Sequence, residues 1–147
     1  MKRVIARATL VVVFVAVFAL GIVSRAQAQE CSNATLQGSF GYTSTGTLLP
    51  VYAQRFAGPF AEVGRQTFDG NGNTSATATL SANGNILKVT IQGTYTVNSD
   101  CSGSMTLNVS PLGVTVHADF VIDSSGVEFR AIGTDSGVVE SRVYKKQ

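Results

Sequence analysis

The sequence has little charge and no excess of basic residues outside its N-terminus. Only 14% of its 147 residues are charged, and four of its eleven Lys and Arg residues lie in the first 28 positions. The chain from Gln29 onward has seven basic and nine acidic residues, hence a net charge of −2, and its only adjacent basic pair is Lys145-Lys146. Nucleic-acid binding requires a basic patch or stripe, so the composition argues against that class of function.

Helical periodicity is missing after Ser39, where the chain is rich in Thr, Val, Ser and Gly. We therefore expect no helix beyond one turn near Ser32 to Leu36. Segments typical of strands recur instead, each bounded by Gly, Asn, Asp, Ser or Pro. They predict eight strands, at 38–47, 59–69, 73–81, 86–97, 103–109, 114–123, 127–134 and 138–145.

Long apolar runs are confined to the N-terminus. Three basic residues in positions 1–7 precede an apolar run over 8–23, and Ala26-Gln27-Ala28 follows with small residues at the spacing of a cleavage site. This order predicts a secretory signal peptide at 1–28, a single domain at 29–147, and a secreted or periplasmic protein without a membrane span after cleavage. A retained membrane anchor is the alternative, but the run is short for a bilayer-spanning helix.

Cysteine is equally scarce, with Cys31 and Cys101 the only two. Two thiols in an exported protein usually form a disulfide, so we predict this pair. Closing a loop of this length stabilises a fold by at most about 4 kcal/mol in the chain-entropy model.

Short turns fix which residues face each other across the predicted hairpins. A two-residue turn at Asn83-Gly84 sets Leu80 opposite Leu87 and Ala78 opposite Val89, so both strands place apolar residues on one face. The same alternation continues through the next two hairpins.

Two later turns complete the predicted register. A Ser124-Ser125 turn sets Phe120 opposite Phe129 and leaves Asp119 opposite Arg130 on the other face. A three-residue loop, Asp135-Ser136-Gly137, sets Phe129 near Val143 and Ala131 near Ser141. Six consecutive strands would then share one apolar face.

Hairpins that join neighbouring strands in order predict an all-β, eight-stranded antiparallel up-and-down barrel, because closure removes the exposed edges. A β-sandwich is the runner-up. The interior would contain the apolar residues of the shared face, which become the candidate lining of a cavity. They are Phe40, Tyr42, Leu87, Val89, Ile91, Tyr95, Met105, Leu107, Val116, Phe120 and Phe129.

The connection from Thr47 to Gly58 is more apolar than a solvated loop requires. Leu48, Leu49, Tyr52 and Phe56 are candidates for a lid over a ligand cavity, or for a plug that simply packs against one barrel end. The sequence leaves both interpretations open.

The stretch FDGNGNTS, from Phe68 to Ser75, resembles a calcium loop in composition. A loop of the EF-hand type that began at Asp69 would need glycine at Thr74 and glutamate at Leu80. Both positions are wrong, and Asp69 is the only carboxylate. We therefore interpret the stretch as a hairpin turn, and we predict no metal site and no cofactor.

His117 is the sole histidine, and alternation places it on the polar face. The same face would carry Asp119, Glu128, Arg130, Glu140 and Arg142. If this face points outward, these residues are solvated and none is catalytic. An outer-membrane pore would have the two faces exchanged, with aromatic girdles outside; here the aromatic residues are scattered among the apolar core positions, which argues against a pore. An isomerase acting inside the barrel would need buried polar groups, and the predicted register offers few beyond the hydroxyls of Tyr42 and Tyr95.

Three runs, CSNATLQGSFGY, FDGNGNTSATATLSANG and GTYTVNSDCSG, resemble small exported bacterial proteins whose barrel is similar to that of allene oxide cyclases and dirigent proteins. The likeness extends from Cys31 to about Val139. It implies a calycin-like barrel with an apolar cavity, which in the plant enzymes folds an unstable fatty epoxide for cyclisation. No stretch matches the catalytic residues of those enzymes. The sequence thus predicts a secreted, disulfide-clamped barrel that binds a small apolar ligand or acts at the cell envelope, with a cyclase-like isomerase or a purely structural module as alternatives.

Overall fold

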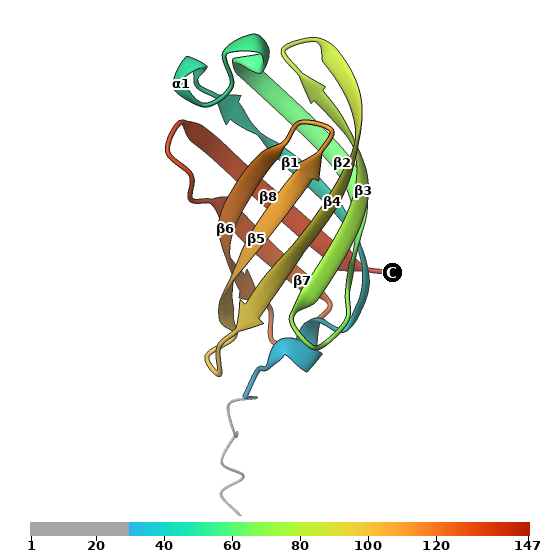
Figure 1. Cartoon of the computed structure of the whole chain (residues 1–147). Coiled ribbons are helices and arrows are strands. Elements are labelled where there is room, and N and C mark those ends of the chain that lie inside the picture. The colour runs from blue at the N-terminus through green and yellow to red at the C-terminus, as the bar shows by residue number, and fades with distance from the viewer. Residues whose placement is uncertain (1–29) are drawn as a thin grey trace, which may run out of the picture.

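Residues 30–147 of the computed structural model form a closed barrel of eight antiparallel strands (Figure 1). The strands are β1 (Gly38–Leu48), β2 (Gly58–Phe68), β3 (Asn73–Ala82), β4 (Asn85–Val97), β5 (Ser102–Ser110), β6 (Val114–Ile122), β7 (Glu128–Gly133) and β8 (Val138–Lys146). The signal peptide predicted at 1–28 lies outside the described residues. Each strand pairs with its neighbours in the chain, and β1 pairs with β8 from Phe40↔Lys146 to Leu48↔Val138. This closure confirms the predicted barrel and excludes the sandwich.

The two ends of the barrel differ (Figure 1). At the disulfide end, the 3-10 helix η1 (Asn33–Leu36) places Leu36, which is fully buried, beneath the core. At the open end, the connection from β1 to β2 forms α1 (Pro50–Ala53) and the 3-10 helix η2 (Gln54–Phe56). The turn of helix expected near Ser32 to Leu36 is confirmed, whereas α1 and η2 were not expected.

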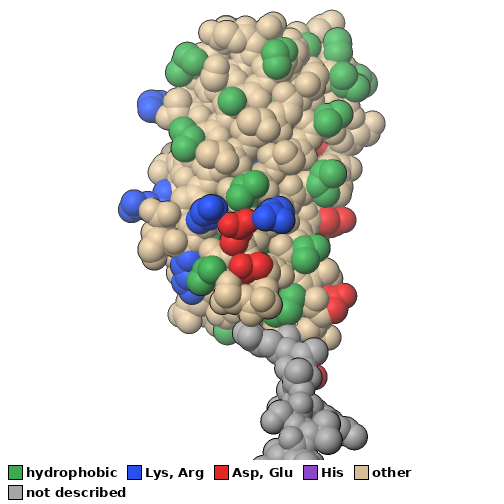
Figure 2. Space-filling model, turned by 180° about the vertical axis from the view of Figure 1, so that it is seen from behind, with side chains coloured by type: hydrophobic (Ala, Val, Ile, Leu, Met, Phe, Trp, Pro, Cys, Tyr) green, Lys and Arg blue, Asp and Glu red, His purple; other side chains and the backbone are tan. Residues whose placement is uncertain are grey.

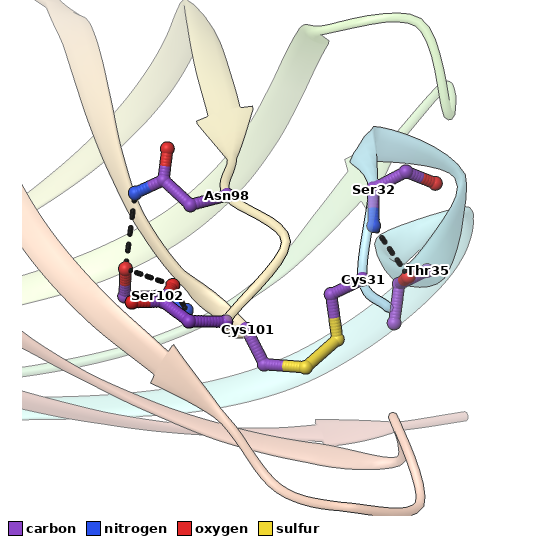
Figure 3. The surroundings of a disulfide bond; sticks show 7 residues. Cys31, Ser32, Thr35, Asn98, Cys101 and Ser102 are labelled. Carbon is purple, nitrogen blue, oxygen red and sulfur yellow. Dashed lines mark hydrogen bonds between the residues drawn. A yellow bond between two sulfur atoms is a disulfide. The ribbon is translucent and has the colours of Figure 1, made fainter. Parts of the chain in front are cut away.

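A disulfide ties the N-terminal segment to the turn between β4 and β5 (Figure 3). Cys31 lies just before η1, and its Cα is 5.0 Å from that of Cys101. The Asn33 side chain adds a second link to the same region, because its Oδ1 accepts a hydrogen bond of 2.8 Å from the Val97 amide. The predicted disulfide is confirmed, and it fixes η1 over the disulfide end.

Large aromatic side chains fill the half of the barrel next to the disulfide end. Phe129 stacks on Tyr144 with ring centroids 4.1 Å apart, and Phe40 meets Phe68 edge to face at 5.6 Å. Gly103 makes room for this cluster, since a Cβ at this position would lie 2.3 Å from the Phe120 ring. Inward positions nearer the open end are mostly aliphatic, as at Leu80, Val109 and Val116, although Phe60 also lies there.

Most of the predicted register is confirmed. Leu80 faces Leu87 and Ala78 faces Val89 across a tight turn at Asn83-Gly84, where both residues have positive φ angles of 46° and 82°. Positive φ at both central residues is the geometry that an Asn-Gly hairpin turn adopts. The FDGNGNTS stretch is also a hairpin turn, and its Asp69 carboxylate accepts hydrogen bonds from the amides of Asn71 (2.7 Å) and Asn73 (2.9 Å).

The register predicted between β6 and β7 is wrong by two residues. The turn is longer than Ser124-Ser125, because the Asp123 amide bonds to the Glu128 carbonyl and the Asp123 carboxylate accepts from the Glu128 amide. Arg130 therefore lies opposite Val121 instead of Asp119. A shift of two residues keeps the faces in phase, so Arg130 still points outward, where its guanidinium is 2.8 Å from Glu128.

The register predicted between β7 and β8 is wrong by one residue, and this error reverses the faces of β8. Phe129 lies opposite Tyr144 instead of Val143, and Ala131 opposite Arg142 instead of Ser141. After Gly133 the chain turns toward β6: the Thr134 amide bonds to the His117 carbonyl, and the Asp135 carboxylate accepts from the His117 amide (2.6 Å). The Asp135 side chain thus bonds to β6, while its carbonyl accepts a hydrogen bond of 3.2 Å from the Val138 amide and closes a turn that differs from the predicted hairpin loop. Glu140 and Arg142, which we expected on the outer face, are buried inside the barrel.

The outer face is a mixture of charged, polar and apolar side chains. Figure 2 shows one side of the barrel, on which basic and acidic side chains gather among scattered hydrophobic ones. His117 lies outside as predicted, with its side chain 51% exposed and its Nδ1 2.7 Å from Asp135. Among residues 30–147, no helix is long and apolar enough to cross a membrane.

Candidate functional site

A cavity of about 260 Å³ lies at the open end of the barrel, between the strands and the α1–η2 connection. Most of its wall is aliphatic or aromatic. The apolar lining residues are Leu48, Phe56, Phe60, Leu80, Ile91, Val109, Leu112, Val114, Val116 and Val138. Phe56 and Phe60 are the aromatic residues in this set, and the rest of the apolar wall is aliphatic.

The connection between β1 and β2 covers part of the cavity. Tyr52, Gln54, Arg55 and Phe56 line it from this side. The connection is held to the β7–β8 loop and to strand β6: the Leu49 amide donates to the Gly137 carbonyl (2.8 Å), and the Tyr52 hydroxyl donates to the Thr115 carbonyl of β6 (3.3 Å). Of the candidate lid residues, Leu48, Tyr52 and Phe56 line the cavity, whereas Leu49 is 44% exposed and does not.

The floor of the cavity is polar. Arg142, Ser44 and Glu62 lie opposite one another on three adjacent strands, β8, β1 and β2, so they form one row across the barrel interior. Glu140 lies one step nearer the open end on β8. Glu62, Glu140 and Arg142 all line the cavity, and they are its charged residues apart from Arg55 at the rim.

Arg142 and Glu140 form a buried ion pair, each with a side chain no more than 5% exposed. The Arg142 Nε donates to Glu140 Oε1 at 2.6 Å, and the Ser44 hydroxyl donates to the same oxygen at 2.6 Å. Arg142 Nη1 also lies 3.4 Å from the Tyr144 hydroxyl, which donates to Gln66 Oε1 at 3.1 Å. These bonds provide the partners that a buried charge pair needs.

Glu62 is a second carboxyl that has no cation bonded to it. The Tyr42 hydroxyl donates to its Oε1 at 2.5 Å, and no other hydrogen bond reaches the Glu62 carboxyl from residues 30–147. Burial raises the pKa of Glu62, because desolvation disfavours the carboxylate more than Tyr42 and Arg142 stabilise it. Burial and the nearby Glu62 likewise raise the pKa of Tyr42, so this phenol stays protonated and acts as a donor.

The sequence analysis missed this polar floor. In β2, Phe60 and Phe68 are eight positions apart, so alternation places both side chains on the same face of the strand. Glu62 and Gln66 are also an even number of positions from Phe60, and they therefore lie on the same inner face. In β8 the two faces are equally mixed, with Val138 and Tyr144 beside Glu140 and Arg142 on one face, and Val139 and Val143 beside Ser141 on the other. Alternation alone could find Glu62 but could not find the ion pair.

The predicted lining residues divide between the cavity and the solid core. Ile91 and Val116 line the cavity. The others belong to the hydrophobic core or pack against it: Phe40, Tyr42, Leu87, Val89, Tyr95, Met105, Leu107, Phe120 and Phe129. Several of these belong to the aromatic cluster near the disulfide end, where their rings pack against one another.

No family model matches the sequence, and no curated protein matches it. Three solved structures share the fold. The chain is similar to a redesigned β-barrel (TM-score 0.56, 17% identity, covering 78% of this chain and 94% of that one) and to the redesigned β-barrel mFAP1 bound to DFHBI (TM-score 0.57, 19% identity, 78% and 97%). A third, EF1p2_mFAP2b bound to DFHBI, has a TM-score of 0.55 at 13% identity, covering 77% and 94%. At these identities the likeness concerns the fold alone.

Proposed function

We propose that the protein is a secreted or periplasmic barrel that binds a small, largely apolar molecule in the cavity at its open end. The observation that carries this proposal is a cavity of about 260 Å³ with an apolar wall and a polar floor. Binding sites for small molecules usually combine a hydrophobic lining with a few placed polar groups. An engineered cavity of about 150 Å³ holds benzene, so this one has room for a molecule somewhat larger than one ring.

The architecture around the cavity supports binding over a purely structural role. A barrel with a purely structural role is most stable when its interior is filled, because the side chains around a void lose dispersion contacts. The chain fills the disulfide end densely and leaves the open end hollow. Barrels of similar fold, mFAP1 and EF1p2_mFAP2b, are bound to a small molecule, DFHBI, which supports the view that such a barrel can hold one.

Cavity filling tests this proposal. Native mass spectrometry of the protein from its own host should detect a copurifying small apolar molecule, and 1-octanol should bind the emptied protein in calorimetry. Val116→Phe adds a ring to the cavity wall, whereas Val121→Phe adds the same ring to the outer face of the same strand, where Val121 is 62% exposed. We expect the first variant to weaken octanol binding at least tenfold and the second to leave it unchanged. Equal affinity in both variants would exclude the cavity as the site.

Export is a separate part of the proposal. The disulfide between Cys31 and Cys101 supports an oxidising compartment, since such bonds are rare in the cytosol of most organisms. N-terminal sequencing of the protein from the periplasm or medium of its host should begin at Gln29. An intact Met1 in that fraction would contradict the predicted signal peptide.

An isomerase acting inside the barrel is a second candidate, and the carboxyl of Glu62, a half-buried residue that lines the cavity, favours it. Glu62 has a raised pKa in an apolar cavity, which is the setting of many general acids and bases. The sequence resembles small exported proteins whose barrel is similar to that of allene oxide cyclases, and this likeness of fold supports the same class of reaction. If this candidate is right, the protein will cyclise an unstable fatty epoxide to one enantiomer, and Glu62→Gln will abolish turnover. A racemic product with the wild-type protein would exclude it.

A further inference from the structure

The charges on the cavity floor are unequal. On the floor, two carboxyls, Glu62 and Glu140, face one guanidinium, Arg142; the fourth charged residue of the lining, Arg55, is exposed and belongs to the β1–β2 connection. Arg142 is already paired, because its Nε and the Ser44 hydroxyl both donate to Glu140 Oε1 at 2.6 Å. Glu62 remains as the carboxyl to which no cation is hydrogen-bonded, although the charge of Arg142 acts on it from nearby.

From this imbalance we infer that Glu62 is the polar anchor of the site and that the ligand is a small apolar molecule carrying a protonated amine. This inference rests on the proposed function, since it concerns the head group of a molecule bound in the same cavity. It names a recognition chemistry that the fold alone does not indicate.

The geometry of Glu62 suits a cationic head group. Its carboxyl lines the cavity floor, and only Oε1 is occupied, by the Tyr42 hydroxyl at 2.5 Å. Oε2 receives no hydrogen bond from residues 30–147 and is free to accept from an ammonium group. Hydrogen bonds between ionised partners are roughly twice as strong as neutral ones, so such a contact would offset much of the cost of removing the amine from water.

An anionic head group fits the same floor poorly. A carboxylate would approach Glu62 and Glu140 together, and the one buried cation within reach already serves Glu140. Burying a charge without a partner is strongly unfavourable. Burial also raises the pKa of Glu62, and an adjacent ammonium would counter this shift by favouring the carboxylate.

Three probes of equal chain length test the inference at pH 8, where an alkylamine is protonated: octylamine, 1-octanol and octanoate. We expect octylamine to bind the wild-type protein at least tenfold more tightly than octanoate. Glu62→Gln keeps the size of the side chain and removes its charge, so it should weaken octylamine binding about tenfold and change octanol binding less than threefold. Glu128→Gln, which removes a carboxyl from the outer face, is the matched control and should change neither affinity.

The outcomes distinguish failure of the proposed ligand-binding function from failure of the proposed role of Glu62. Failure of octanol and both charged probes to bind would overturn the proposed function and this inference with it. Binding of octanol without a preference for the amine, or with octanoate as the tightest probe, would leave the cavity as a ligand site and overturn the role of Glu62. If Glu62→Gln does not fold, the order of the three affinities in the wild-type protein still decides, because the inference requires octylamine to be the tightest.

Discussion

The buried ion pair on β8 gives the sharpest test of the structure. Arg142→Met removes the guanidinium and keeps a side chain of similar length and apolar character. It leaves the Glu140 carboxyl buried with Ser44 as its only remaining hydrogen-bond donor. Because the side chains of both partners are no more than 5% exposed, solvent can compensate little. Breaking a buried pair by removing one partner costs about 3–5 kcal/mol, and we expect a loss of this size in the free energy of unfolding.

The reverse single change and the double change complete a mutant cycle. Glu140→Gln should cost somewhat less, about 2–4 kcal/mol, because Glu62 on the same cavity floor still offers Arg142 a countercharge. In the double variant neither side chain is charged, so its loss should be smaller than the sum of the single losses by about 2 kcal/mol. Urea unfolding followed by circular dichroism at pH 7 and 25 °C measures all four free energies.

An exposed pair on the neighbouring strand serves as the control. Glu128 and Arg130 are 2.8 Å apart, but the Arg130 side chain is 76% exposed. The same cycle at these positions should give a coupling below about 1 kcal/mol. If the cycle at Glu140 and Arg142 is additive within about 0.5 kcal/mol, the pair is solvated, and the inward register of β8 is wrong.

Three further changes test other parts of the molecule. Replacing Cys31 and Cys101 together by Ser should lower the free energy of unfolding by up to about 4 kcal/mol, because the disulfide joins residues 70 positions apart. Octanol binding at the other end of the barrel should be retained in the folded fraction. The pKa of Glu62 in the folded state lies above 4.5, so the folded protein binds more protons than the unfolded chain just above this pH. The free energy of unfolding should therefore fall as the pH rises from 4.5 through the folded-state pKa of Glu62. This decline should be shallower in Glu62→Gln. Val139→Lys should change stability by less than about 0.5 kcal/mol, since Val139 is 66% exposed, and a loss of several kcal/mol would place Val139 inside.

Sequence reasoning succeeded where a short turn and a clear alternation agree. Asn83-Gly84 is the strongest such case, since its turn type fixes the pairing of Leu80 with Leu87 without reference to the rest of the barrel. The positions of the strands, their order and the disulfide were also predictable, because turn residues and cysteines are local signals. A closed barrel follows from these local signals once every strand pairs with its neighbour.

The two wrong registers have a common cause. In both turns an aspartate side chain decides the loop length: Asp123 accepts from the Glu128 amide, and Asp135 accepts from the backbone and ring of His117. The contact of Asp135 with His117 joins residues 18 positions apart, and His117 belongs to the neighbouring strand β6. The sequence of the β7–β8 hairpin alone therefore cannot predict it. The α1–η2 connection was likewise recognisable only as an apolar loop, because its shape depends on contacts with Gly137 and Thr115.

The register of β8 determines what kind of barrel this chain forms. In the predicted register Val139 and Val143 would face inward with Ser141, and the charges of Glu140 and Arg142 would be in water. The observed register instead stacks Tyr144 on Phe129 within the aromatic cluster and brings an ion pair to the floor of the cavity. Because shifting a strand by one residue exchanges its two faces completely, no intermediate arrangement exists. The exposed contact between Asp135 and His117 therefore acts together with the Tyr144 stacking to select the face of β8 that gives the cavity its polar groups.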